Sequence, residues 1–133
     1  METNLHDNQR LVIEKVTYWM HGPQRGDVVV IQPPPHTGTI PLIKRVVALA
    51  GERIEIREGR VYIDGALLDE PYVHEKDFYN MPAQIVPPLH IFVLGDNRRA
   101  SNDSRAFGPV PIKTVLGRAW LSYWPLSELK VIR

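Results

Sequence analysis

A chain of 133 residues is long enough to bury its own core, and we expect a single domain over residues 1–133. Its 16 basic and 15 acidic residues leave a net charge of +1, which gives no basic footprint for nucleic acid. Cysteine is absent, which excludes a disulfide framework and a thiolate nucleophile, and the five histidines lack metal-ligand spacing, so we expect neither metal nor cofactor.

Two strands are predicted in the first third of the chain. Residues 11–16 (LVIEKV) follow a polar, turn-like cluster. The four β-branched residues 28–31 (VVVI) predict a strand that is covered on both faces, and prolines 33–35 must end it because proline donates no ladder hydrogen bond. No apolar run in the chain approaches the ~20 residues that span a bilayer, so we expect the chain as it stands to be soluble.

Residues 41–51 (PLIKRVVALAG) predict an apolar strand that contains two cations. Strict alternation places one set of side chains on one face, Leu42, Lys44, Val46 and Ala48, and the other set on the opposite face, Ile43, Arg45, Val47 and Leu49. Because both faces are otherwise apolar, a lysine here would tend to lose its proton, whereas a guanidinium stays charged. Lys44 is therefore the candidate for a neutral amine that acts as a general base. The alternative is a lysine that reaches the surface from an ordinary strand.

The remaining pattern is also rich in strands. Residues 53–57 and 60–64 alternate around Glu58-Gly59, which predicts a tight hairpin, and residues 66–68 follow a second turn. Residues 69–88 are broken by prolines and predict a long excursion without strands. Two further strands are expected at 90–94 and 115–124. Since no long helical stripe is visible, we expect an antiparallel β sandwich or partly open barrel, with long irregular loops and little helix.

The polar segment 95–108 (GDNRRASNDSRAFG) holds the densest group of short hydroxyl and carboxylate side chains. Ser101 could hydrogen-bond a neutral lysine amine. Asp103 and Arg105 are two residues apart and could pair to fix the loop. The same composition also fits a solvated loop with Asx-type turns, and spacing alone does not separate the two interpretations.

Four blocks of the sequence, in order, resemble the type I signal peptidases, which are membrane-bound serine endopeptidases with a serine/lysine dyad. The blocks are residues 25–31 (RGDVVVI), 43–52 (IKRVVALAGE), 95–108, and 117–119 (GRA) followed by YWP at 123–125. A lysine-arginine pair in an apolar strand is weak alone, but four blocks in the same order are specific. The resemblance implies the β fold of that family and its activity, the removal of signal peptides from secreted proteins.

The resemblance also assigns roles within the blocks. Lys44 would be the general base, Ser101 would orient its amine, and Asp103 with Arg105 would form a supporting ion pair. Two more residues would lie on the turn that positions this loop, Asp96 and Asn97.

On the substrate side, the resemblance makes Leu42 and Ile43 one wall of a cleft. A signal peptide of a preprotein would bind there as an added strand and be cut after small residues. Met1 aligns with the residue that follows the nucleophilic serine and would line the same site. The serine, the oxyanion hydroxyl and the membrane anchor would then precede Met1, so we expect residues 1–133 alone not to cleave peptides, and the full-length parent to be anchored on the extracytoplasmic side of a membrane.

Several positions depart from the usual family residues, namely Thr3, Asn4, Ala50, Arg99 and Ala100. With the serine upstream, a non-catalytic β module that binds peptides stays open as an alternative. A self-cleaving repressor of the SOS type also pairs serine with lysine, but no helix-turn-helix pattern precedes Lys44 and segment 95–105 has no counterpart there.

Overall fold

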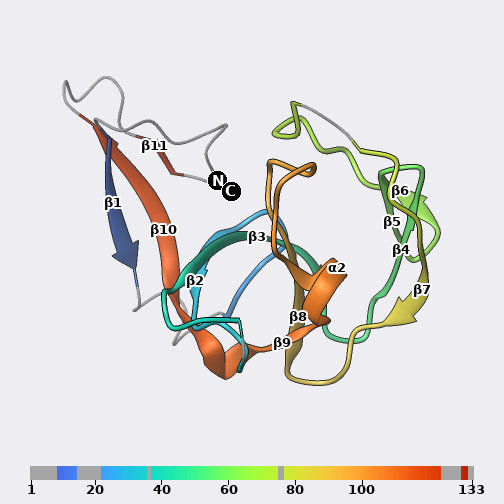
Figure 1. Cartoon of the computed structure of the whole chain (residues 1–133), viewed down its shortest axis with the longest axis horizontal. Helices are drawn as coiled ribbons and strands as arrows, with labels where there is room; N and C mark the ends of the chain where they lie inside the picture. Colours follow the sequence, from blue (N-terminus) through green and yellow to red (C-terminus); the bar gives the residue numbers. More distant parts are fainter. Residues whose placement is uncertain (1–8, 15–21, 36, 75–76, 124–129, 132–133) are drawn as a thin grey trace.

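The computed structural model describes residues 9–14, 22–35, 37–74, 77–123 and 130–131. Nearly all of its regular structure is β, in two antiparallel sheets (Figure 1). The strands are β1 (Gln9–Glu14), β2 (Val28–Ile31), β3 (Leu42–Leu49), β4 (Arg53–Arg57), β5 (Arg60–Ile63), β6 (Ala66–Leu67), β7 (Met81–Ile85), β8 (His90–Leu94), β9 (Val110–Pro111), β10 (Val115–Tyr123) and β11 (Lys130–Val131). The helices are α2 (Ser104–Phe107) and a 3-10 turn, Ile112–Thr114.

The larger sheet has the strand order β1-β10-β2-β3-β8-β9, with β11 also paired to β10. The smaller sheet has the order β6-β5-β4-β7 and stands to one side of the larger one in Figure 1. Both orders run from one edge strand to another, so within the described residues neither sheet closes into a barrel. The expected antiparallel β fold with little helix is confirmed.

The apolar core lies on both faces of β3 and β8. One cluster joins the two sheets and consists of Val47, Ala48, Ile54, Ile56, Val61, Ile63, Met81, Val86, Phe92 and Leu94. A second cluster packs against the other face and consists of Val29, Ile31, Val46, Ile91, Val93 and Val110. In β2, Val29 and Ile31 belong to the second cluster, and Val28 and Val30 belong to a third, small one with Ala119. Burial on both sides therefore explains the continuous apolar run of β2, as its residues predict.

The predicted alternation along β3 is wrong beyond Val46. The pairing with β8 shifts between Val46 and Ala48, which is a β-bulge or a similar irregularity. As a result Ala48 joins Val47 in the first cluster, and Leu49 packs against the second cluster with Val46. The assignment of Lys44 and Arg45 to opposite faces precedes the irregularity and does not depend on it.

Residues 69–88 were expected to contain no strand, and this prediction is wrong. β7 (Met81–Ile85) pairs with β4 at the edge of the smaller sheet. Pro82 is compatible with that place because an edge strand has one side whose N–H groups are not needed for the ladder.

Smaller differences concern element ends. The first strand is Gln9–Glu14, two residues earlier than predicted, and residues 15 and 16 lie outside the described part. The last long strand ends at Tyr123, and residue 124 is likewise outside it. The predicted hairpin is present, with both Glu58 (φ 50°) and Gly59 (φ 78°) in the left-handed region, as a tight turn requires. No helix among the described residues has the length and apolar character needed to cross a membrane.

Candidate active site

Lys44 sits where β3 loses its neighbour on one side. On β2 its partner is Val29, but the ladder between β3 and β8 ends at Arg45 and Leu94. Beyond Leu94 the chain leaves the sheet and the loop 95–103 brings Ser101 back to the lysine. The Lys44 Nζ donates a hydrogen bond to Ser101 Oγ at 3.0 Å, a contact between residues 57 positions apart.

The surroundings of Lys44 favour its neutral form. Burial lowers the pKa of the half-buried Lys44 amine, because a charged ammonium loses water there. Asp103 acts in the opposite direction and raises this pKa, while Arg105 lowers it again. The net direction is downward, which favours the neutral amine that a general base requires.

Gly95 allows the lysine and the serine to meet. A Cβ at position 95 would lie 2.0 Å from Ser101 Oγ, 2.7 Å from Ser101 Cβ and 3.5 Å from Lys44 Nζ. No other residue fits there without displacing Ser101. Glycine is needed here for close approach and not for a left-handed backbone, since its φ is not among the positive values.

Asp103 fastens the loop to the end of β8. It is fully buried; its Oδ2 accepts a hydrogen bond from the Gly95 N–H at 3.1 Å, and its Oδ1 caps α2 by accepting from the Arg105 N–H at 3.0 Å. The Arg105 guanidinium also donates to both carboxylate oxygens, at 3.0 Å each. Next to it, Ser104 Oγ accepts from the Val93 N–H at 3.0 Å. The expected pair of Asp103 and Arg105 is therefore present, and α2, which the sequence did not predict, begins at it.

Arg45 forms a buried ion pair with Asp96 on the other face of β3. Its Nε and Nη2 donate to Asp96 Oδ1 and Oδ2 at 2.8 and 2.6 Å, and its Nη1 donates to the Gly26 carbonyl at 3.0 Å. The two side chains are 3% and 0% exposed. The guanidinium also lies 4.0 Å from the centroid of the Tyr72 ring. Asp96 thus fixes the residue next to the lysine rather than the lysine itself.

The remaining predicted site residues are Asn97, Leu42, Ile43 and Met1. The Asn97 carbonyl accepts from the Ala100 N–H at 3.1 Å, which makes it part of the turn in the loop. Leu42 packs against the second core cluster and Ile43 against a third, small one. Among the described strands both residues pair only with β2, so the opposite edge of β3 carries no strand at this point. Met1 lies outside the described residues.

The sequence matches the family described as signal peptidase, peptidase S26, over residues 1–124. The chain belongs to this family. The resemblance in the four sequence blocks is therefore confirmed.

Named relatives agree with that assignment. A probable signal peptidase I-1 of Synechocystis sp. is 42% identical over 96% of this chain and 68% of its own length. The thylakoidal processing peptidase 1 of Arabidopsis thaliana, a chloroplastic protein, is 35% identical over 97% of this chain. The chain spans 41% of that plant protein and 62% of a second Synechocystis relative.

A solved structure shows the same fold. The crystal structure of a signal peptidase I from Enterococcus faecalis has a TM-score of 0.64 and is 31% identical in sequence. The match covers 80% of this chain and 98% of that one. The β architecture expected from the resemblance is thus the architecture of the signal peptidase family.

Two residues outside the four sequence blocks, Glu70 and Tyr72, also contact residues around the candidate site. Tyr72 donates to Glu70 Oε2 at 3.1 Å, and Glu70 forms a nearly buried ion pair with Arg98, whose Nε donates to the Gly95 carbonyl at 2.8 Å. Burial raises the pKa of Tyr72, so its phenol keeps the proton that it donates. No local pattern in residues 69–80 signals the ion pair, because Glu70 and Arg98 are 28 positions apart. A buried arginine in the loop, however, always requires an acceptor from somewhere.

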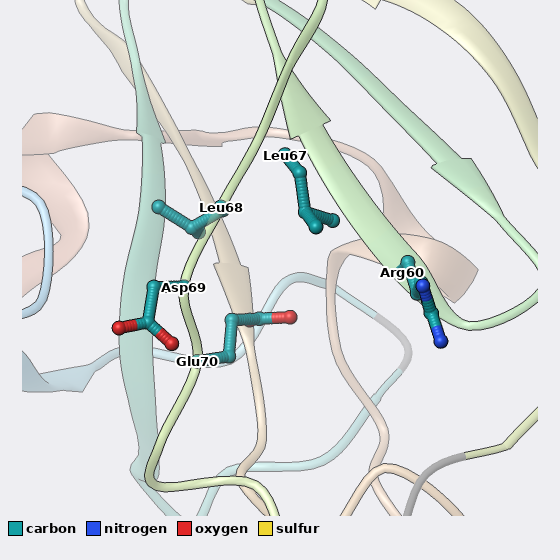
Figure 2. A pocket seen from close by; sticks show the side chains of 5 residues that line it. All are labelled: Arg60, Leu67, Leu68, Asp69 and Glu70. Carbon is teal, nitrogen blue, oxygen red and sulfur yellow. The ribbon is translucent and has the colours of Figure 1, made fainter.

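The pocket beside Glu70 is separate from the lysine. It has a volume of about 340 Å³ and is lined by Arg60, Leu67, Leu68, Asp69 and Glu70 (Figure 2). Neither Lys44 nor Ser101 lines it. Among the described residues there is also no group of three or more histidine, aspartate or glutamate side chains arranged to hold a metal ion. The open edge of β3 beside the lysine is therefore the more relevant feature for a peptide substrate.

Proposed function

We propose that this chain carries the lysine half of the catalytic dyad of a signal peptidase I-type serine endopeptidase, with Lys44 as the general base. The observation that supports this most directly is the 3.0 Å contact from Lys44 Nζ to Ser101 Oγ, made by an amine whose pKa is lowered by burial. Family membership supports the reaction class, and this contact supports Lys44 as the residue that moves the proton.

The reaction would be an acyl transfer. Neutral Lys44 would take the proton from the hydroxyl of the family's nucleophilic serine, and the serine oxygen would attack the peptide carbonyl. The resulting lysine ammonium then protonates the leaving amine. In the second half Lys44 takes a proton from water, which hydrolyses the ester and releases the serine.

Ser101 would orient the base. Its hydroxyl oxygen accepts one amine hydrogen, so the rotation of the amine is restricted and the nitrogen lone pair can be directed at the nucleophile. Asp103 and Arg105 would support this contact indirectly, since Asp103 binds the Gly95 N–H and the Arg105 guanidinium and so fixes the loop that carries Ser101.

The substrate would be the signal peptide of a preprotein, bound as an extended strand. The edge of β3 at Leu42 and Ile43 carries no strand from the described part of the sheet, and its backbone groups could pair with a peptide that runs beside Lys44. Because that peptide would lie against β3 backbone, small side chains near the cut bond would be preferred.

The parent protein would be anchored in a membrane, with this β region on the extracytoplasmic side or its organellar equivalent. The proposal comes from the family, in which one relative is named a thylakoidal, chloroplastic enzyme.

A cleavage assay tests the proposed function. The chain is produced with a serine before Met1, preceded by the corresponding segment of the Synechocystis relative, and is offered a peptide that spans a signal-peptide cleavage site with small residues. We expect a single cut after the small residue. The matched control carries alanine in place of that serine and should give no product. Undiminished cleavage by the alanine form would contradict the proposal.

A further inference from the structure

An acid from outside the motif blocks reaches the loop that holds the lysine. Asp77, in the stretch before β7, accepts a hydrogen bond from Arg105 Nη1 at 2.7 Å through its Oδ2. Arg105 also donates to Asp103 and, at 2.9 Å, to the Arg98 carbonyl. One guanidinium is therefore shared between two carboxylates, and only Asp103 belongs to the loop.

The smaller sheet holds Asp77 from the other side. A Cβ on Gly59, in the turn between β4 and β5, would lie 2.0 Å from the Asp77 carbonyl oxygen, so the turn packs directly on this residue. The Gly59 N–H donates to the Tyr79 carbonyl at 2.8 Å. The Tyr79 ring in turn lies 5.5 Å from the Arg105 guanidinium. The β4–β5 hairpin thus restricts the position of the Asp77 carboxylate.

We propose that Asp77 is a positioning residue for Lys44. Asp77, which packs against the smaller sheet, holds Arg105 and so keeps Asp103 and Ser101 in the arrangement that orients the Lys44 amine. This inference rests on the proposed function and adds to it a residue from the proline-rich stretch. Asp77 does not touch Lys44, and it acts through Arg105. The Asp77 side chain is 23% exposed, so it can be replaced without disrupting the apolar core.

The charged groups around Lys44 predict the direction in which its pKa changes when Asp77 is replaced. Besides burial, the charged groups that act on the amine are Asp103, which raises its pKa, and Arg105, which lowers it. On β2 the facing residue is the apolar Val29. If Arg105 loses Asp77 and moves away from Asp103, its lowering effect fades and Asp103 is less neutralised. Both changes favour the ammonium, so the pKa of Lys44 must rise.

The experiment is an NMR titration of residues 1–133 labelled with ¹³C-lysine. The chain has only five lysines, and Lys44→Arg assigns the Lys44 Cε–Hε signal. Wild type is compared with Asp77→Asn, with Asp77→Glu, which keeps the charge, and with Asp69→Asn as the matched control, because Asp69 is an exposed acid of the same stretch. In the serine-bearing form used for cleavage, kcat and KM are measured for the same variants.

We expect the Lys44 midpoint to move to higher pH in Asp77→Asn, to return toward wild type in Asp77→Glu, and to stay unchanged in Asp69→Asn. The rate constant kcat should fall roughly ten- to a hundred-fold in Asp77→Asn with little change in KM, because a small misplacement of the base affects the chemical step. An unchanged Lys44 midpoint in Asp77→Asn would overturn the inference, as would equal shifts in Asp77→Asn and Asp77→Glu. A wild-type Lys44 that titrates like a lysine in a short unstructured peptide would overturn the proposed function itself.

Discussion

Replacing Lys44 by alanine is expected to lower kcat/KM for signal-peptide cleavage by about 10²- to 10⁴-fold, the usual contribution of a general base. The loss should appear in kcat and leave KM nearly unchanged. The reason is that Lys44 binds Ser101 through its amine, whereas a substrate strand would pair with the backbone of β3. The measurement is steady-state cleavage of the signal-peptide substrate by the serine-bearing form.

Two further variants make this result specific. Lys44→Arg keeps a positive charge but cannot deprotonate at accessible pH, so it should be as inactive as alanine. Lys113→Ala removes an exposed lysine and should leave turnover intact. Near-normal kcat in Lys44→Ala, or in Lys44→Arg, would refute the role of a neutral amine.

Replacing Asp96 by alanine is expected to lower the free energy of unfolding by about 3–5 kcal/mol, because it leaves a charged guanidinium buried without its acid. Arg45 is 3% exposed and cannot lose its proton to escape this cost. Its remaining contacts, the Gly26 carbonyl and the Tyr72 ring, carry no full negative charge. Urea unfolding followed by tryptophan fluorescence measures the loss.

The control is a carboxylate in a surface pair. Glu55 pairs with Arg57 at 3.7 Å, and Arg57 is 56% exposed, so Glu55→Gln should change the unfolding free energy by less than about 1 kcal/mol. The double variant Arg45→Met with Asp96→Leu should recover part of the loss, since it removes both buried charges. A loss of unfolding free energy in Asp96→Ala no larger than that in Glu55→Gln would show that the buried Arg45–Asp96 pair does not stabilise the fold.

Local sequence predicts those parts of this fold that local physics determines. The β-branched residues of β2, the alternation in β4 and β5 and the Glu58-Gly59 turn each specify their structure within a few positions. β7 was missed because Pro82 reads as a strand breaker, and only its pairing with β4 makes it an edge strand. The irregularity after Val46 was missed because it depends on the register with β8.

The candidate site divides in the same way. Lys44 was identified from its place in an apolar strand, and Ser101, Asp103 and Arg105 from the polar loop and the family resemblance. Asp77, Glu70 and Tyr72 were not found, because they come from a stretch with no periodic pattern and meet their partners only in the folded chain. The sequence places Asp96 on the turn of the loop but does not reveal its ion pair with Arg45, because Arg45 is 51 positions earlier.

The central claim, that burial lowers the pKa of a Lys44 amine which is held by Ser101, is tested most directly by the NMR titration of wild-type residues 1–133. Burial should make the Lys44 Cε–Hε signal titrate at lower pH than that of a lysine in a short unstructured peptide. If Lys44 and the peptide lysine titrate together, the Lys44 amine is an ordinary solvated ammonium and the account is contradicted.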